Sequence, residues 1–340
     1  MALSYQQPGL TLARGISSTY VRDLQRDLRS LGYLRRGIDG SFGPGTESAV
    51  KALQHDLLFN HGEGSDGLAP VAVTWYNRGR VGGVTGVVDQ SLVACIADML
   101  ADPAFPKLPA AVDPRAENQK IAIQIAALPP TSAPTPFLVA VLKRESNLQH
   151  FAVPTTTVDA DSFVVVGTDT NNTATPYAIT SRGYGAGQFT LFHHPPRPEE
   201  VEQVILDPGK NVQAAAKEMR VKMDGYVAGP ASKADDRIAE IGPGPVRLCK
   251  YAPGDARYMT DCKACIKAAG TRDIAPGLPV FTGSTLKWST TQYYSTATYL
   301  AVPKRENVGC DWPYAIRRYN GSGINSYHYQ ALVLKNIAAQ

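Results

Sequence analysis

Two amphipathic helical patterns on either side of one tight turn constrain the fold of this chain more than any other feature. The apolar positions are Val21, Leu24, Leu28 and Leu31 in the first pattern and Ala49, Val50 and Leu53 in the second. Both sets recur at the three- and four-residue spacing of one helix face. Gly32 is placed to end the first helix, and Thr46 is placed to open the second as its N-cap. Residues 15–57 are therefore expected to form two helices with facing apolar stripes.

The turn between these helices reads IDGSFG at residues 38–43. Its glycines permit positive φ, and Phe42 is expected to hold the loop against the helical core. A related pattern, GVTGVVDQSLVACIADML, follows at residues 83–100 and predicts a third helix. Between them, residues 57–82 make a longer link than a compact three-helix unit needs. The first hundred residues therefore read as one small helical domain, at 14–105, after a tail at 1–13.

These residues resemble the peptidoglycan-binding domain of the three-helix type that occurs on many cell-wall hydrolases. The resemblance runs through V-x-x-L-Q-x-x-L-x-x-L-G-Y and then D-G-x-F-G-x-x-T-x-x-A-V-x-x-L-Q. It implies that peptidoglycan glycan strands are the partner. The residues that it assigns to binding are Asp39, Gly40, Phe42, Gly43 and Thr46. A helical docking module without affinity for sugar is the alternative.

Residues 106–135 are rich in proline and alanine, and we expect an extended connector that contains one helix. A single carboxylate, Glu145, then lies at the polar end of an apolar helical stripe. The apolar members of that stripe are Leu138, Val141, Leu142 and Leu148. A carboxyl group among apolar neighbours has a raised pKa, which suits a catalytic acid at neutral pH. The alternative is a helix-end glutamate that reaches solvent or pairs with Lys143 or Arg144.

Four separated pieces of the chain resemble, in order, the motifs of lysozyme-like lytic transglycosylases. The pieces are Glu145-Ser146, the Gly-Ala-Gly-Gln run at 185–188, the helix start at 207–212 and Tyr319-Asn320-Gly321. The resemblance implies that Glu145 is the catalytic acid and base. It assigns substrate binding to Ser146, Gly185, Gln188, Tyr319 and Asn320. The implied catalytic domain covers residues 136–340 and contains a loop-rich insertion at 228–309.

Alternating residues after position 151 predict a β-hairpin, which carries Asp159, Asp161 and Asp169. The expected fold is therefore mainly α: a small three-helix N-terminal domain and a larger lysozyme-like α+β domain with a short β-hairpin next to the active site. A hydrolytic muramidase needs a second carboxylate, and one of these aspartates is a candidate for it. The other interpretation is that all three are surface turn residues.

The predicted reaction is cleavage of the β-1,4 bond between N-acetylmuramic acid and N-acetylglucosamine, as a lytic transglycosylase that leaves 1,6-anhydro-muramyl ends. This route uses one carboxylate and no water, because the muramyl 6-hydroxyl is the nucleophile. A hydrolytic muramidase that uses Glu145 with an aspartate is the first alternative. A non-catalytic peptidoglycan-binding protein is the second.

The net charge of +4 is too small for a nucleic-acid-binding footprint, and no apolar run is long enough for a membrane span. We expect a monomer without cofactor or assigned metal. It would act in the periplasm or cell wall and, since no secretory signal is recognisable, reach it by lysis or dedicated secretion. Cys95 is expected in the core. For Cys249, Cys262, Cys265 and Cys310, two disulfides are favoured over a zinc site or free thiols.

Overall fold

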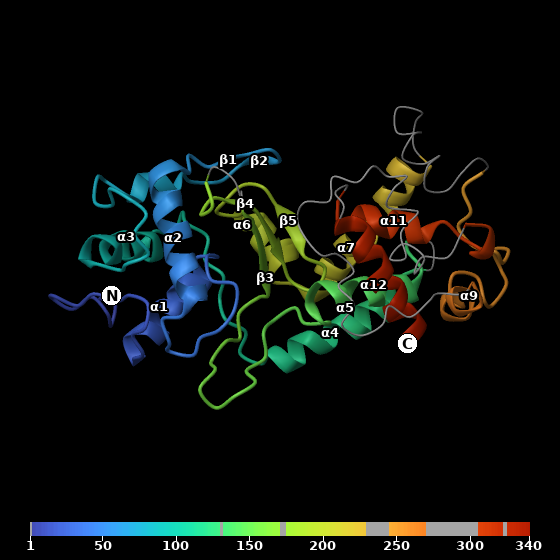
Figure 1. Cartoon of the computed structure of the whole chain (residues 1–340), viewed down its shortest axis with the longest axis horizontal. Coiled ribbons are helices and arrows are strands. Elements are labelled where there is room, and N and C mark those ends of the chain that lie inside the picture. Colours follow the sequence, from blue (N-terminus) through green and yellow to red (C-terminus); the bar gives the residue numbers. More distant parts are fainter. Residues whose placement is uncertain (1, 130–131, 171–174, 229–244, 270–304, 322–324) are drawn as a thin grey trace. The chain divides into compact units, whose positions relative to one another are not determined.

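The computed structural model describes residues 2–129, 132–170, 175–228, 245–269, 305–321 and 325–340. Contacts divide the chain into two compact units (Figure 1). The first unit contains residues 1–122 and 149–211, and the second contains residues 123–148 and 212–340. Helices α4 (Pro114–Ala127) and α7 (Pro208–Lys222) each contribute residues to both.

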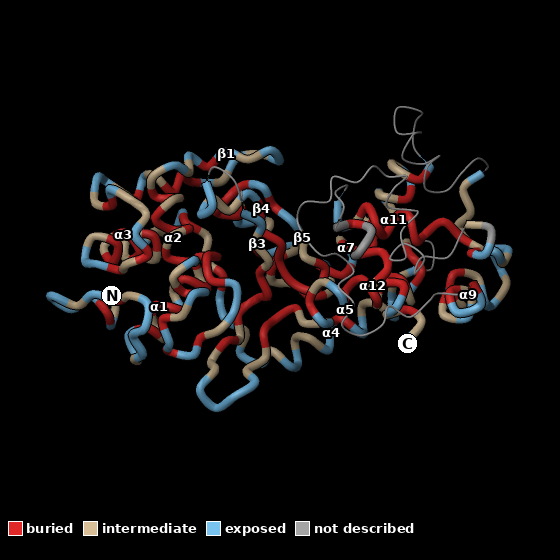
Figure 2. Tube along the Cα trace, viewed as in Figure 1, coloured by how far each residue is buried: buried red, intermediate tan, exposed pale blue. Residues whose placement is uncertain are grey.

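The N-terminal part of the first unit is the expected three-helix arrangement. Its helices are α1 (Thr19–Ser30), α2 (Pro44–Phe59) and α3 (Gln90–Ala101), with a short hairpin β1 (Glu63–Gly64) and β2 (Gly67–Leu68) and the 3-10 turn η1 (Val73–Tyr76) between α2 and α3. The predicted stripes form its core, where Leu24, Leu53 and Ile96 are fully buried (Figure 2). One detail of the prediction was wrong. Gly43, not Thr46, occupies the N-cap position of α2, because Pro44 already adopts the first helical position.

The rest of the first unit is built on a three-stranded antiparallel sheet. Strand β4 (Ile179–Tyr184) lies between β3 (Val166–Thr170) and β5 (Phe189–Leu191). The predicted hairpin is therefore present and has a third strand, but it begins at Val166, so that Asp169 lies in it and Asp159 and Asp161 precede it. Short helical segments follow it, α6 (Pro198–Glu200) and the π-turn η2 (Val201–Ile205). The apolar face of the sheet is covered by the buried side chains of Leu108, Phe151, Val201 and Ile205.

Two buried ion pairs connect the three helices to this sheet region within the first unit. Arg29 of α1 donates to the carboxylate of Asp161 at 3.1 Å, and both side chains are almost completely buried. Arg182 of β4 donates to Asp56 of α2 at 3.1 Å, and the hydroxyl of Tyr33 donates to the same carboxylate oxygen at 2.9 Å. A buried charge that loses its partner destabilises a protein strongly. These pairs therefore tie the helical region and the sheet into one unit.

The second unit is helical in its described residues. Helix α12 (Asn325–Ala339) packs against α5 (Thr135–Ser146), α11 (Trp312–Tyr319) and α9 (Cys262–Ala268). The remaining elements are the π-turn η3 (Met223–Val227), which continues α7, and the 3-10 turn η6 (Arg305–Asn307). Gly225 lies inside this π-helical segment, so the helical structure that begins at Pro208 continues past it.

The described chain is thus mainly helical with two small sheets, as the sequence predicted. Of the insertion predicted at 228–309, the structure describes 228, 245–269 and 305–309. None of the described helices is long and apolar enough to cross a membrane.

Candidate functional site

The end of helix α5 fixes the position of the candidate catalytic acid. The helix stops at Asn147, whose φ of 57° lies in the left-handed region that asparagine tolerates better than most residues. The N–H group of Asn147 donates to Lys143 O at 3.0 Å, and that of Leu148 donates to Leu142 O at 3.3 Å. These bonds satisfy the carbonyl groups of the final turn, in which Glu145 lies. The carboxylate therefore projects from a rigid helix end.

The Glu145 carboxyl group is held by a tyrosine from another helix. The hydroxyl of Tyr329, which is only 4% exposed on α12, donates to Oε1 of Glu145 at 2.5 Å. Burial raises the pKa of Glu145 above its ordinary value, while the Tyr329 hydrogen bond and the charge of Arg144 act in the opposite direction. Desolvation is the largest cause. The carboxyl group thus keeps its proton to a higher pH than a solvated glutamate does.

A second tyrosine lies within electrostatic reach of this carboxylate. Burial, followed by the negative charge of Glu145, raises the pKa of Tyr319 well above its ordinary value. Tyr319 is the last residue of α11, and the exposed Asn320 follows as its C-cap. The hydroxyl of Ser146 donates to Leu142 O at 3.1 Å, within its own helix. The structure therefore brings Glu145 and Tyr319 together on packed helices and adds Tyr329 to them.

The predicted glycine-rich turn joins strands β4 and β5 in the first unit. Gly185 has a φ of 72°, and a Cβ atom there would lie 2.4 Å from the ring of His150. The side-chain amide of Gln188 folds back and donates to Gly185 O at 2.8 Å. Its Oε1 lies over Gly167 and Gly183, where any Cβ atom would collide with it. Both predicted residues therefore shape the turn itself.

Two buried polar side chains support the same turn. His150 accepts a hydrogen bond from Ala186 N–H at Nδ1 (3.3 Å), and its Nε2 bonds to Ile205 O at 2.8 Å. Burial lowers the pKa of His150 to about 4, so the ring is neutral at pH 7 and its Nε2 carries the proton. Asn211 accepts from Gly187 N–H at 2.8 Å and donates to Tyr184 O at 3.0 Å. These bonds hold the turn against the start of α7.

The three aspartates considered for a second catalytic carboxylate have different environments. Asp161 is buried and bonds through one oxygen to Arg29 and through the other to Gly37 N–H at 3.2 Å. Asp159 accepts from Asp161 N–H at 3.0 Å, and the exposed Asp169 accepts from Ser181 at 3.3 Å. Asp161 is therefore committed to a structural ion pair.

The predicted peptidoglycan-binding residues surround one buried glutamine. Gln25 donates to Asp39, to Ser41 O and to the hydroxyl of Thr46, each at 3.0 Å, and accepts from Gly40 N–H at 2.8 Å. Gly40 has a φ of 78°, which favours glycine. Phe42 is 2% exposed, and Gly43 opens α2. All five predicted residues thus take part in building the turn, and Asp39 lies at its exposed edge.

The same construction recurs one helix later. Gln54 of α2 accepts from the N–H groups of Thr85 and Gly86 at 2.9 and 2.8 Å, and donates to the Thr85 hydroxyl and to Val87 O at 3.0 Å. Asp89 then caps α3 by accepting from Leu92 N–H at 2.9 Å. In each helix, the glutamine of a Leu-Gln pair therefore holds the turn that follows the helix by hydrogen bonds. This is the structural counterpart of the repeated pattern in the sequence.

Sequence reasoning missed the roles of Tyr329, His150 and the two glutamines. The glutamines did carry a signal, because both occupy the same place in the repeated pattern at Leu24-Gln25 and Leu53-Gln54. Tyr329 and His150 carried none, since each meets its partner only through the packing of distant segments.

Comparison with known proteins agrees with the N-terminal arrangement. A family model described as a putative peptidoglycan binding domain matches residues 17–57. That segment contains α1, the turn at residues 38–43 and most of α2. No curated protein matches the chain, and no solved structure does. The chain therefore carries an N-terminal peptidoglycan-binding domain, and Glu145 with its neighbours lies outside the matched segment.

Proposed function

We propose that this chain, which associates with the cell wall through its peptidoglycan-binding domain, is a peptidoglycan-degrading enzyme. The bond cleaved is the β-1,4 linkage between N-acetylmuramic acid and N-acetylglucosamine, and Glu145 is the acid and base. The observation that carries the proposal is the desolvated Glu145 carboxyl group, bonded to Tyr329 and close to Tyr319. Perturbed carboxyl groups of this kind are typical of catalytic acids.

The raised pKa of Glu145 suits both halves of the reaction. The protonated carboxyl group donates its proton to the leaving glycosidic oxygen as the bond to the sugar carbon breaks. The carboxylate then accepts the proton of the muramyl 6-hydroxyl, whose oxygen forms the new bond to that carbon. The product is a 1,6-anhydro sugar, and no water is consumed. Tyr329 acts as a positioning residue, because its hydrogen bond fixes one carboxyl oxygen.

A one-carboxylate route fits the surroundings of Glu145. Among the described residues of its own unit, the charge that acts on the pKa of Glu145 is that of Arg144, and Glu218 acts on the pKa of the neighbouring Tyr319. Hydrolysis with retention or inversion requires two carboxyl groups around the scissile bond. Asp161, one of the three aspartates considered for that role, is already bonded to Arg29. We therefore favour the lytic transglycosylase over the muramidase.

The test is the chemical structure of the products released from purified Gram-negative sacculi. The wild-type protein is compared with Glu145→Gln, which keeps the size of the side chain and removes its acid function. Glu117→Gln is the control, because Glu117 pairs with Lys120 on the surface of α4. We expect 1,6-anhydro ends from the wild type and the control, and none from Glu145→Gln.

Binding of each protein to the sacculi is measured in the same samples by sedimentation. Glu145→Gln is expected to bind as the wild type does, since the peptidoglycan-binding domain is unchanged. Reducing muramyl ends would replace the transglycosylase with the hydrolytic muramidase. If the wild-type protein binds the sacculi and they stay intact, the proposed activity is refuted and the chain is a non-catalytic wall-binding protein.

A further inference from the structure

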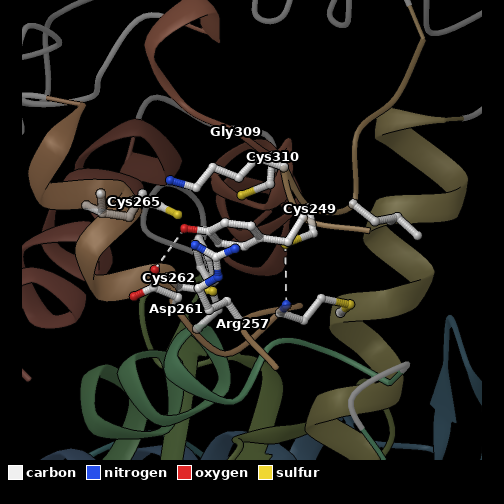
Figure 3. Close-up of a pocket in the computed structure, with 13 residues that line it drawn as sticks. Cys249, Arg257, Asp261, Cys262, Cys265, Gly309 and Cys310 are labelled. Carbon is white, nitrogen blue, oxygen red and sulfur yellow. Dashed lines mark hydrogen bonds between the residues drawn. The ribbon is translucent and has the colours of Figure 1, made fainter. Parts of the chain in front are cut away.

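Four of the five cysteines lie around one cavity in the second unit. Cys249, Cys262, Cys265 and Cys310 line it together with Lys250, Tyr251 and Arg257 (Figure 3). The fifth, Cys95, is buried in α3 of the first unit. All five are free thiols in the structure. Residues up to 61 positions apart in the chain, from 249 to 310, therefore place their sulfurs against a common space.

A buried aspartate holds two of these cysteines side by side. Asp311 is 0% exposed, and its carboxylate accepts from Arg247 N–H at 2.9 Å and from the Arg305 guanidinium at 2.9 Å. Its own N–H donates to Arg247 O at 2.8 Å. One residue further on, the indole of Trp312 donates to Leu248 O at 3.1 Å. The stretches that carry Cys249 and Cys310 are therefore fixed next to each other, independently of any bond between the sulfurs.

The other two cysteines share one face of a helix. Cys262 and Cys265 lie three residues apart at the start of α9, so their side chains project in similar directions. Helix α9 packs against α12 and α5, which holds it in place. A Cys-x-x-Cys pair combined with two further cysteines is a common ligand set for structural zinc.

Hydrogen-bond donors and cations lie beside the sulfurs. The Sγ atom of Cys249 accepts a hydrogen bond from Met259 N–H at 3.3 Å, and Cys310 accepts one from the backbone of Trp312. Lys250 and Arg257 bring two positive charges to the cavity, and Asp261 brings one negative charge that is bonded to the Tyr251 hydroxyl at 3.0 Å. A disulfide is uncharged and gains little from N–H donors and cations, whereas thiolates gain from both.

Four thiols in one place, two of them buried, also oppose one another's ionisation. A divalent cation removes this opposition, because each thiolate is then next to a positive charge.

We propose that Cys249, Cys262, Cys265 and Cys310 form a tetrahedral zinc site that stabilises the loop-rich region around α9. Binding releases four thiol protons, and the zinc with four thiolates carries a net charge of −2, which Lys250 and the Asp255-paired Arg257 offset in part. No three donor side chains among the described residues already form a metal-binding group. The thiol side chains therefore rotate inward on binding, to a Zn–S distance of about 2.3 Å. The metal supplies folding free energy to residues 245–269, where α9 is the one helix described.

The test is the metal content of the full-length chain, purified with a reductant and passed through gel filtration. We expect about one zinc per chain by elemental mass spectrometry, as for a single structural site. Exchange with Co²⁺ is expected to give the absorption of tetrahedral tetrathiolate cobalt. Cys95→Ser is the matched control and keeps the metal. Cys262→Ser and Cys265→Ser are expected to lose it. If substitution of the buried Cys262 prevents folding, Cys265→Ser at the half-exposed position is the variant tested.

Two results would overturn the proposal. An intact mass lower by four hydrogens, with no zinc and these four cysteines resistant to alkylation, would establish two disulfides. If no zinc is found and all five thiols are alkylated after unfolding, the cysteines are free thiols that bind no metal. Thermal unfolding followed by circular dichroism adds a second readout. We expect a chelator to lower the melting temperature of the wild type and to leave that of Cys265→Ser unchanged.

Discussion

Removal of one hydroxyl group, in Tyr329→Phe, tests the environment of Glu145 without any assumption about activity. Tyr329 is buried on α12 and donates to Oε1 of Glu145 at 2.5 Å. The substitution keeps the aromatic ring and its packing. It removes a hydrogen bond that favours the charged form of a carboxyl group whose pKa burial has already raised. The variant therefore raises the pKa of Glu145 further.

The effect on the free energy of unfolding depends on pH. A hydrogen bond to a charged group contributes about 1.5–3 kcal/mol, and one between neutral groups contributes about 0.5–1.5 kcal/mol. Because the folded-state pKa of Glu145 lies above its unfolded value, the folded protein retains a proton that the unfolded chain has released. Stability from this group is thus lost as the pH rises through the folded pKa. The loss is larger in Tyr329→Phe, by about 1 kcal/mol or more.

The assay is urea unfolding followed by circular dichroism, from about pH 4 to about pH 8, where a glutamate with a raised pKa titrates. The same hydroxyl is also removed in a Glu145→Gln background, where we expect a small effect that does not change with pH. Equal destabilisation by Tyr329→Phe at all pH values, or the same pH dependence in the Gln background, would refute the coupling between the Tyr329 hydroxyl and the ionisation of Glu145.

Two further predictions concern the first unit. Asp161→Asn leaves the buried charge of Arg29 without its partner and is expected to cost about 3–5 kcal/mol in urea unfolding, whereas the exposed Asp169→Asn stays within about 0.5 kcal/mol. Similar values for both would contradict the buried ion pair. Gly185→Ala introduces a Cβ atom 2.4 Å from His150 at a φ of 72°. The backbone strain alone costs about 1–3 kcal/mol, so we expect Gly185→Ala to have a lower melting temperature than the wild type. Equal melting temperatures would contradict a tightly constrained turn.

The helices and their buried faces were predictable because the apolar residues recur with the period of the structure that they form. The stripes of α1 and α2 are examples, since helical spacing places all of their residues on one face and every one of them is buried. Helix boundaries were less secure. Thr46 has the chemistry of an N-cap, yet Pro44 starts the helix earlier and the Thr46 hydroxyl bonds to Gln25 instead. Pro44 was a local signal for the earlier start, whereas the bond between Thr46 and Gln25 joins residues 21 positions apart and is not contained in any local pattern.

The environment of Glu145 was only partly predictable. Its place at the end of an apolar stripe indicated desolvation, but its partner Tyr329 is 184 residues away in the chain. The buried pairs of Arg29 with Asp161 and of Arg182 with Asp56 lie at similar separations, 132 and 126 residues. Charged residues read singly suggest solvent exposure. Only the packing of α1, α2 and the sheet brings opposite charges together and makes their burial tolerable.

The peptidoglycan-binding pattern and the Glu145 site carry information of different kinds. Gly40, Phe42 and Thr46 belong to the matched pattern, and their contacts are internal: a left-handed turn, a buried ring and a bond to Gln25. The side chains of Phe42 and Thr46 are buried and so are not exposed at the surface of the domain. A match to this pattern therefore identifies the domain through its folding requirements, and we expect the surface that meets the wall to include exposed residues of the turn such as Asp39 and Ser41. Substitutions on that exposed rim are the ones that separate wall binding from stability.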